Sequence, residues 1–110
     1  MRGCLRLVSG GGAQVWADGA RPEAARLLEV KHVGQPDKSP FIADSQCEEW
    51  LRLKIERDIT GEFRRYAAVI NDPSTPATSL EVIVNDARAV PYFEKLFRKF
   101  GIPGEVVVRP

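Results

Sequence analysis

The chain has 110 residues, which is enough for one hydrophobic core but leaves no room for a second domain. Its 16 Lys and Arg against 15 Asp and Glu give a formal net charge of +1. A protein that coats nucleic acid by charge alone is usually more basic, so this balance argues against a passive coat. A nuclease is not excluded, because metal ions supply part of the positive charge at such a site. No stretch approaches the ~18 apolar residues of a membrane span, so we expect no membrane partner.

The first third of the chain predicts a small antiparallel meander. Three strands are expected, at residues 5–8, 13–17 and 27–33. Asp18-Gly19 is a turn signal directly after the second strand. Proline keeps residues 19–25 irregular or briefly helical. Residues 34–44 then form a long loop, a feature that is often functional in a small domain.

The rest of the chain alternates helices and strands. Ser45 and Glu48 form a capping box that is expected to start a long helix. Apolar residues recur along that helix at steps of three and four, at Leu51, Ile55, Ile59, Phe63, Tyr66 and Ile70. A strand at 80–84 follows. A second helix ends at Gly101, and a last strand is expected at 105–108.

These elements predict an α/β fold in the order β-β-β-α-β-α-β. The strand–helix–strand unit in the second half favours parallel pairing through a right-handed crossover. We expect residues 1–110 to form a single domain, in which residues 1–12 are loosely ordered.

A group of charged residues near the third strand carries the predicted chemistry. Glu29 and Lys31 point to the same face of their strand, and Val30 points to the other. Asp18 ends the preceding strand and can approach Glu29 if the two strands pair. Two carboxylates can hold one or two hard divalent cations such as Mg²⁺ or Mn²⁺. The lysine can orient or deprotonate an attacking water or neutralise charge, and a metal beside it should depress its pKa.

The Glu-x-Lys spacing alone is weak evidence, because about a third of chains this long contain one by chance. The alternative is a solvated strand edge where Glu29 and Lys31 only face water. The apolar residues around the triplet and the acid that ends the preceding strand favour the nuclease interpretation. We also expect Lys31 to be exposed, so that its removal leaves folding nearly intact.

Longer segments of the chain resemble a known family. They are Trp16–Gly19, Leu28–Val33, Ser39–Asp44 and Phe63–Pro73. Together they resemble the restriction-endonuclease-fold toxin domains at the C-termini of bacterial polymorphic toxins, within the PD-(D/E)xK nuclease superfamily. The resemblance covers nearly the whole chain from residue 13 onward.

The resemblance implies a restriction-endonuclease-like fold, with a mixed central sheet flanked by helices. It implies that Asp18, Glu29 and the Val30 backbone carbonyl bind Mg²⁺ or Mn²⁺, and that Lys31 assists catalysis. Gln46 is a candidate supporting catalytic residue, with helix capping or simple exposure as the alternative. The usual first helix of the fold is not recognisable before residue 13, so the chain is either a truncated form or part of a longer polypeptide that carries this helix upstream.

The resemblance also implies a biological role. The chain would be delivered as part of a larger toxin and act on nucleic acid in the target-cell cytoplasm, and a cognate immunity protein would silence it in the producing cell. DNA and RNA both stay open as substrates. The alternative is a catalytically inactive binding module that keeps the nuclease fold.

Other conspicuous residues are expected to have structural roles. Arg64 and Arg65 on the long helix are candidate phosphate contacts, but a solvated helix face is the stronger interpretation for each alone. We expect Trp16 and Trp50 to pack in or beside the core rather than to stack on bases.

Overall fold

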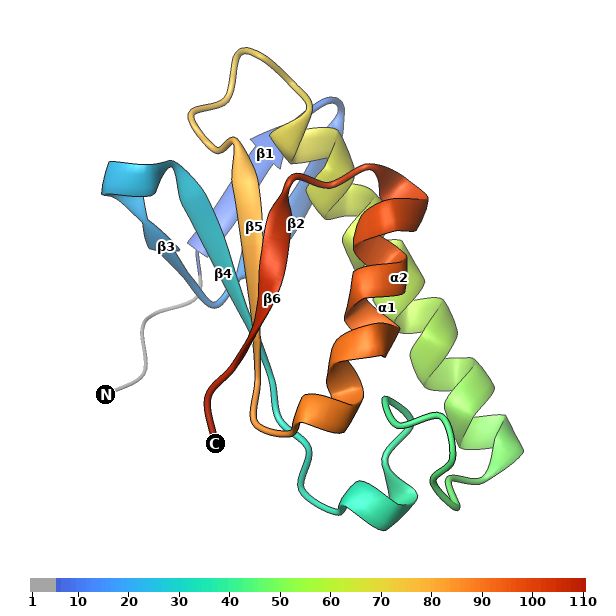
Figure 1. The fold of residues 1–110 in the computed structure, drawn as a ribbon. Coiled ribbons are helices and arrows are strands. Elements are labelled where there is room, and N and C mark those ends of the chain that lie inside the picture. Colours follow the sequence, from blue (N-terminus) through green and yellow to red (C-terminus); the bar gives the residue numbers. More distant parts are fainter. Residues whose placement is uncertain (1–5) are drawn as a thin grey trace.

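The computed structural model describes residues 6–110 and shows a mixed α/β fold (Figure 1). Its elements are β1 (Arg6–Gly10), β2 (Ala13–Ala17), β3 (Gly19–Arg21), β4 (Arg26–Lys31), α1 (Glu49–Ile70), β5 (Ser79–Val84), α2 (Val90–Phe100) and β6 (Gly104–Val108). Single 3₁₀ turns occupy Pro22–Ala24, Pro36–Lys38 and Ala87–Ala89. Leu5, where the first strand was expected to begin, lies outside the described residues.

The strands form two sheets. A four-stranded sheet has the order β3-β4-β5-β6, in which β3 is antiparallel to β4, and the β4–β5 and β5–β6 pairs are parallel. β1 and β2 form a separate antiparallel hairpin. The predicted parallel pairing in the second half is confirmed. The predicted meander is only partly right, because the short extra strand β3, and not β2, lies in register beside β4.

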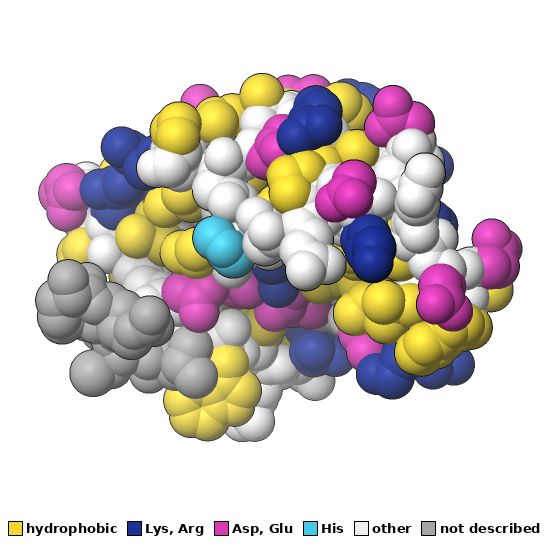
Figure 2. All heavy atoms as spheres, turned by 90° about the horizontal axis from the view of Figure 1, so that it is seen from below, with side chains coloured by type: hydrophobic (Ala, Val, Ile, Leu, Met, Phe, Trp, Pro, Cys, Tyr) yellow, Lys and Arg dark blue, Asp and Glu magenta, His cyan; other side chains and the backbone are white. Residues whose placement is uncertain are grey.

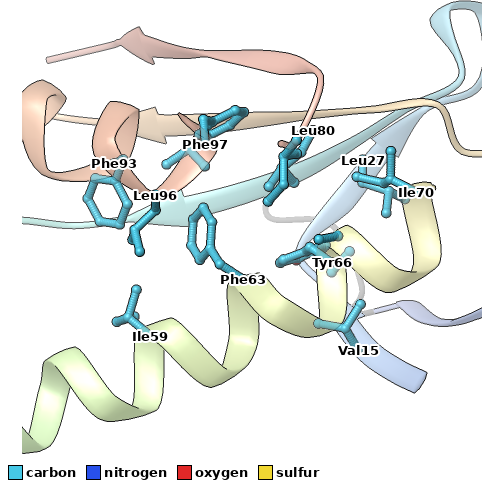
Figure 3. Packing of buried hydrophobic residues seen from close by; sticks show 14 of the residues in the cluster. Val15, Leu27, Ile59, Phe63, Tyr66, Ile70, Leu80, Phe93, Leu96 and Phe97 are labelled. Carbon is cyan, nitrogen blue, oxygen red and sulfur yellow. The ribbon is translucent and has the colours of Figure 1, made fainter. Parts of the chain in front are cut away.

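Both helices pack on the same face of the larger sheet (Figure 1). The apolar stripe of α1 is confirmed, since Ile59, Phe63, Tyr66 and Ile70 are all buried. Phe63 contacts the ring of Phe93 on α2, with 5.9 Å between ring centroids. Figure 3 shows these side chains filling the space between the helices and the sheet. The core therefore fixes α1 directly over β4 and β5.

The start of α1 differs from the prediction. The helix begins at Glu49, and its N-cap residue Glu48 makes no side-chain capping bond. Ser45 lies in the preceding loop, where its hydroxyl donates to the Ser39 carbonyl and accepts a hydrogen bond from Arg52 at 3.0 Å. The capping-box prediction is therefore wrong, because this serine caps a loop turn and not the helix.

Two glycines shape the end of the chain. Gly101 ends α2 with φ 63°, which confirms the predicted C-terminal cap. Gly104 begins β6 with φ 145°, and a Cβ placed there would lie 1.8 Å from the carbonyl oxygen of Leu80. Only glycine allows β6 to pass this close to β5.

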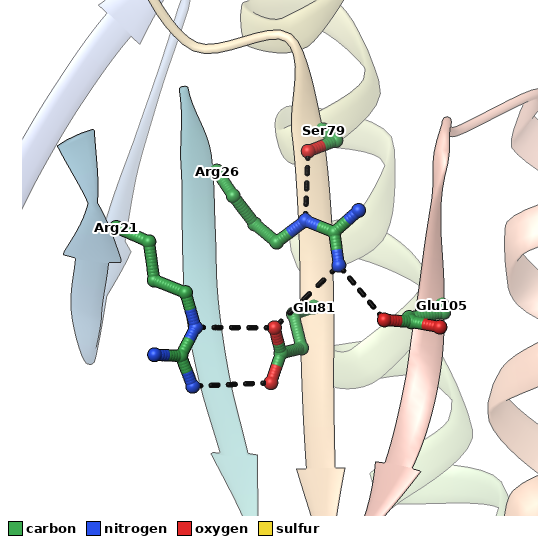
Figure 4. A network of polar contacts seen from close by, with 5 residues as sticks. All are labelled: Arg21, Arg26, Ser79, Glu81 and Glu105. Atoms are coloured by element: carbon green, nitrogen blue, oxygen red, sulfur yellow. Dashed lines mark hydrogen bonds and ion pairs between the residues drawn. The ribbon is translucent and has the colours of Figure 1, made fainter. Parts of the chain in front are cut away.

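The sheet face turned away from the helices carries a network of charged side chains (Figure 4). Glu81 on β5 is only 4% exposed and pairs with Arg21 at 3.3 Å and with Arg26 at 3.5 Å. Arg26 also pairs with Glu105 at 3.0 Å and donates to Ser79 at 3.1 Å. Within residues 6–110, helices therefore cover one face of the sheet, as predicted, and charged side chains cover part of the other face.

Both tryptophans lie at the surface, contrary to expectation. Trp16 is 56% exposed on β2, and Trp50 is 62% exposed in the first turn of α1. Neighbouring residues supply the packing instead: Val15 and Ala17 are the buried side chains of β2. Among the described residues, no helix is long and apolar enough to cross a membrane.

Candidate active site

Asp18 lies at the junction between β2 and β3, beside β4. Its backbone N–H donates to the Leu28 carbonyl at 3.0 Å. Its carboxylate accepts a hydrogen bond from the Val30 N–H at 2.7 Å. Both bonds hold Asp18 against the edge of β4, so the predicted approach of Asp18 to the Glu29 strand occurs although β2 itself does not pair there.

Glu29 and Lys31 share the face of β4 that is turned toward α1. Lys31 Nζ lies 2.9 Å from Glu29 Oε2. Glu29 is only 4% exposed, and the Lys31 side chain is 16% exposed. Val30 points to the opposite face and is 52% exposed. The predicted alternation is confirmed, but Lys31 is far less exposed than expected.

α1 adds two side chains that the sequence interpretation did not include. Glu62 Oε1 lies 2.8 Å from Lys31 Nζ, so the ammonium sits between two carboxylates. The Tyr66 hydroxyl donates to Glu29 Oε1 and lies 3.3 Å from the Trp16 carbonyl oxygen. Glu62 and Tyr66 are one helical turn apart, and this spacing was the available signal.

The surroundings shift the pKa values of Glu29, Lys31 and Tyr66. Burial raises the pKa of the Glu29 carboxyl to about 7, against the opposing effect of Lys31. Burial alone would lower the pKa of Lys31, but Glu29 and Glu62 together raise it above its ordinary value. The cause of this rise is that two carboxylates face the ammonium. The depression expected beside a bound metal stays a prediction. Burial and Glu29 raise the pKa of the Tyr66 hydroxyl, which therefore stays protonated and donates.

The Val30 carbonyl is directed toward the same edge as Asp18. In a strand, the N–H and C=O of one residue point to the same side, and the Val30 N–H points to the Asp18 carboxylate. The pairing of β3 with β4 ends at Gly19 and Leu28, so β3 offers no ladder partner to this carbonyl. The backbone oxygen is therefore a candidate ligand beside the two carboxylates.

Gln46 is not brought to this cluster. It is exposed in the loop before α1, and its backbone N–H donates to the Asp37 carbonyl at 2.6 Å. Within the described part of the chain, its side chain makes no hydrogen bond to Asp18, Glu29 or Lys31.

The donor set fits a hard divalent cation in its chemistry. Asp18, Glu29 and the Val30 carbonyl offer oxygen atoms only, which Mg²⁺ and Mn²⁺ prefer. Among residues 6–110, no three Asp, Glu, His or Cys side chains converge as a closed metal cage. A cation at Asp18 and Glu29 would therefore rely on water and substrate oxygens to complete its shell.

The cluster lies toward the end of the sheet where β4, β5 and β6 have their carboxyl termini. Figure 2 views the molecule from this end and shows acidic and basic side chains close together near the centre of the face. A hollow of about 250 Å³ lies next to Lys31, with His32, Asn85 and Arg109 in its lining. Another cavity, of about 320 Å³, is mostly apolar and lies among residues such as Val8 and Ala77, away from the carboxylates. Val30 and Ile83 also line the first hollow, so it opens on the side of β4 that Val30 faces, and neither Asp18 nor Glu29 is in its lining.

The comparison with known families places the chain. The model of the family Restriction endonuclease fold toxin 2 matches residues 4–103. The chain belongs to this family. No curated protein and no solved structure matches it. This match confirms the resemblance to restriction-endonuclease-fold toxin domains that was inferred from the sequence. The mixed sheet and the two helices are consistent with that fold.

Proposed function

We propose that this toxin domain hydrolyses phosphodiester bonds in nucleic acid with a divalent metal ion at Asp18 and Glu29. The observation that carries the proposal is the buried pair of Glu29 and Lys31 next to Asp18 at the edge of β4. Folding alone does not require an acid and a lysine on a buried strand face. A metal-dependent nuclease can use both, the acid to hold a cation and the lysine to balance phosphate charge.

The residues of the cluster would divide the work between binding the metal and stabilising the phosphate. Asp18, Glu29 and the Val30 carbonyl supply oxygen ligands. A divalent cation bound there would polarise the scissile phosphate and acidify the attacking water. Lys31 neutralises the charge that develops on the phosphate, and Glu62 holds its ammonium in place at 2.8 Å. Tyr66 orients the Glu29 carboxylate through its hydroxyl.

The family supports delivery as part of a larger bacterial toxin that acts in the cytoplasm of a target cell. A toxin nuclease must be silenced where it is made, so we propose a cognate immunity protein. Such a partner would present acidic side chains to the cleft that receives phosphate, and its association would weaken at high salt.

The direct test is cleavage by the purified chain with Mg²⁺ or Mn²⁺ against plasmid DNA, total RNA and tRNA. Metal binding is measured in parallel by calorimetry. Asp18→Ala and Glu29→Ala should each abolish metal binding and cleavage. Asp58→Ala is the matched control, because Asp58 is an exposed acid on α1. Binding that survives in both site variants would place the metal elsewhere.

Lys31 is tested by single-turnover cleavage. Lys31→Ala should reduce the rate by ~10²-fold or more, the scale for removing a positioned electrostatic or acid–base group. Lys31→Arg should not restore the full rate, because guanidinium is larger and differently shaped. Full activity in Lys31→Ala would remove the lysine from the mechanism. A native chain inactive on every nucleic acid with metal present would instead favour an inactive binding module.

A further inference from the structure

Trp16 is an exposed aromatic side chain on the outer face of the β1–β2 hairpin. Its neighbours Val15 and Ala17 face the core, and Trp16 itself is 56% exposed. Leu7, opposite Trp16 in the hairpin register, is 47% exposed. Tryptophan is highly buried on average, so an open indole with an apolar neighbour points to a binding role.

The position of Trp16 links it to the candidate active site. Its carbonyl oxygen lies 3.3 Å from the Tyr66 hydroxyl, and that hydroxyl also binds the Glu29 carboxylate. Asp18 follows only two residues later in the chain. One side chain, Tyr66, therefore joins the Trp16 backbone to the Glu29 carboxylate, and the exposed indole belongs to the residue two positions before Asp18.

An exposed cation lies on the adjoining part of α1. Arg65 directly precedes Tyr66 and is exposed. Its Nη1 would lie 3.5 Å from a Cβ placed on Gly61, so its guanidinium extends back along α1 by about one turn. Within residues 6–110, Arg65 has no ion-pair partner. It is thus available to a phosphate of a strand that passes the site.

We propose that Trp16 stacks on an unpaired base next to the scissile phosphate, so that the substrate is single-stranded DNA or RNA. This inference rests on the proposed nuclease function and names its substrate class. Bases in a duplex are stacked on one another, whereas single strands expose base faces that aromatic side chains bind. Stacking on one aromatic side chain changes affinity by about 5- to 150-fold.

A protein partner is the competing occupant, because exposed tryptophans are also enriched at protein interfaces. The short separation of Trp16 and Asp18 favours nucleic acid, since only one residue lies in the chain between the exposed indole and a carboxylate that would hold the metal. The two occupants make different predictions for cleavage when no other protein is present.

The experiment measures cleavage kinetics of the full chain on single-stranded and duplex oligonucleotides of the same sequence. Trp16→Ala should lower kcat/KM on single strands by about 5- to 150-fold. The loss should be mainly in KM, because stacking holds ground state and transition state alike. Trp16→Phe should recover most of it. Trp50→Ala is the control, since Trp50 is similarly exposed but its indole donates to Glu48 at the far end of α1.

A second arm uses the substrate instead of the protein. Removing one base at a time from a single-stranded oligonucleotide should weaken wild-type cleavage at one position next to the cut. The same removal should have no effect on Trp16→Ala. Thermal melting of each variant is run alongside, and Trp16→Phe keeps the test valid if Trp16→Ala does not fold.

The outcomes separate this inference from the function on which it rests. Metal-dependent cleavage that is equal in Trp16→Ala and Trp50→Ala overturns the stacking role and leaves the nuclease intact. Preferred cleavage of the duplex oligonucleotide would also overturn the stacking role. If Trp16→Ala leaves the cleavage kinetics unchanged but abolishes binding to a protein partner, Trp16 belongs to the surface that binds that partner. If the native chain cleaves neither single strands nor duplex with metal present, the nuclease proposal fails and the stacking role falls with it.

Discussion

Lys31 is the cation that faces the buried Glu29 carboxylate, and replacing it by alanine measures what that charge contributes to folding. Its ammonium lies between Glu29 and Glu62, and its side chain is 16% exposed. Removing one partner of a buried pair leaves the other charge uncompensated and costs ~3–5 kcal/mol. We therefore expect Lys31→Ala to destabilise the fold, in contrast to the expectation from sequence that this lysine is dispensable for folding.

Proton uptake by Glu29 limits this loss and makes it depend on pH. The pKa of Glu29 in the folded chain is about 7, above its ordinary value of 4.5, so ionised Glu29 opposes folding. That penalty is absent below the ordinary pKa, grows as the pH rises to about 7 and is constant above. Lys31 lowers this pKa, so its removal extends the penalty to higher pH.

The expected difference follows from these values. Each further unit of pKa rise costs about 1.4 kcal/mol above the new pKa. At about pH 8 the added penalty from Glu29 is at most ~1.4 kcal/mol, because Glu29 takes up a proton once its pKa exceeds the pH. Together with the lost pair to Glu62, Lys31→Ala should lower the free energy of unfolding by ~2 kcal/mol at that pH. At about pH 5, where Glu29 is protonated in both proteins, only the pair with Glu62 is lost, and the difference should fall to ~1 kcal/mol.

The assay is urea unfolding followed by circular dichroism, with chelator present so that no metal binds. Lys54→Ala is the matched control, because Lys54 pairs with Asp58 at 3.4 Å and is 56% exposed. It should cost less than ~1 kcal/mol at either pH. A loss in Lys31→Ala that does not change with pH, or that equals the Lys54→Ala loss, would refute this account of the cluster.

Three further predictions, which use five substitutions, test the fold by chemical denaturation. Phe63→Ala should cost ~3–5 kcal/mol, because Phe63 is fully buried, and a loss below ~1 kcal/mol would contradict its place in the core. Glu81→Ala should cost ~2–3 kcal/mol, because the Glu81 carboxylate is buried. Glu105→Ala should cost less than ~1 kcal/mol, because the Glu105 side chain is 60% exposed. Equal losses would show that burial of the carboxylate does not determine the cost. Gly104→Ala should destabilise the fold by several kcal/mol, since the added Cβ would clash with a backbone oxygen of β5. At Gly101 the added Cβ would meet no atom within 4 Å, so Gly101→Ala should cost ~1 kcal/mol. Similar losses at the two glycines would rule out the backbone clash.

Local patterns were enough to predict the features that depend on one strand or one helix. The alternation of Glu29, Val30 and Lys31 follows from strand geometry alone. The buried stripe of α1 and the cap at Gly101 follow from helix geometry. The parallel sheet followed from the helix between two strands.

Features that depend on how elements meet could not be read from local pattern. Glu62 was not recognised as a site residue, because the rotation of α1 over β4 is set by the whole core. Ser45 fits a capping box in sequence, but Arg52 and the Ser39 carbonyl compete for its hydroxyl in the folded loop. Trp16 was assigned to packing because tryptophan is usually buried, yet β2 turns Val15 and Ala17 inward.

The distribution of the site along the chain also bears on when the domain becomes active during its synthesis. Trp16 and Tyr66, which are in contact, are 50 residues apart in sequence. The strand that carries Glu29 and Lys31 is held along its other edge by β5, which ends at Val84. A nascent chain that has not yet released β5 from the ribosome lacks the neighbour that fixes this strand. Because a domain folds as a unit, we expect the candidate site to assemble only after β5 has emerged, so that shorter nascent chains carry no complete site.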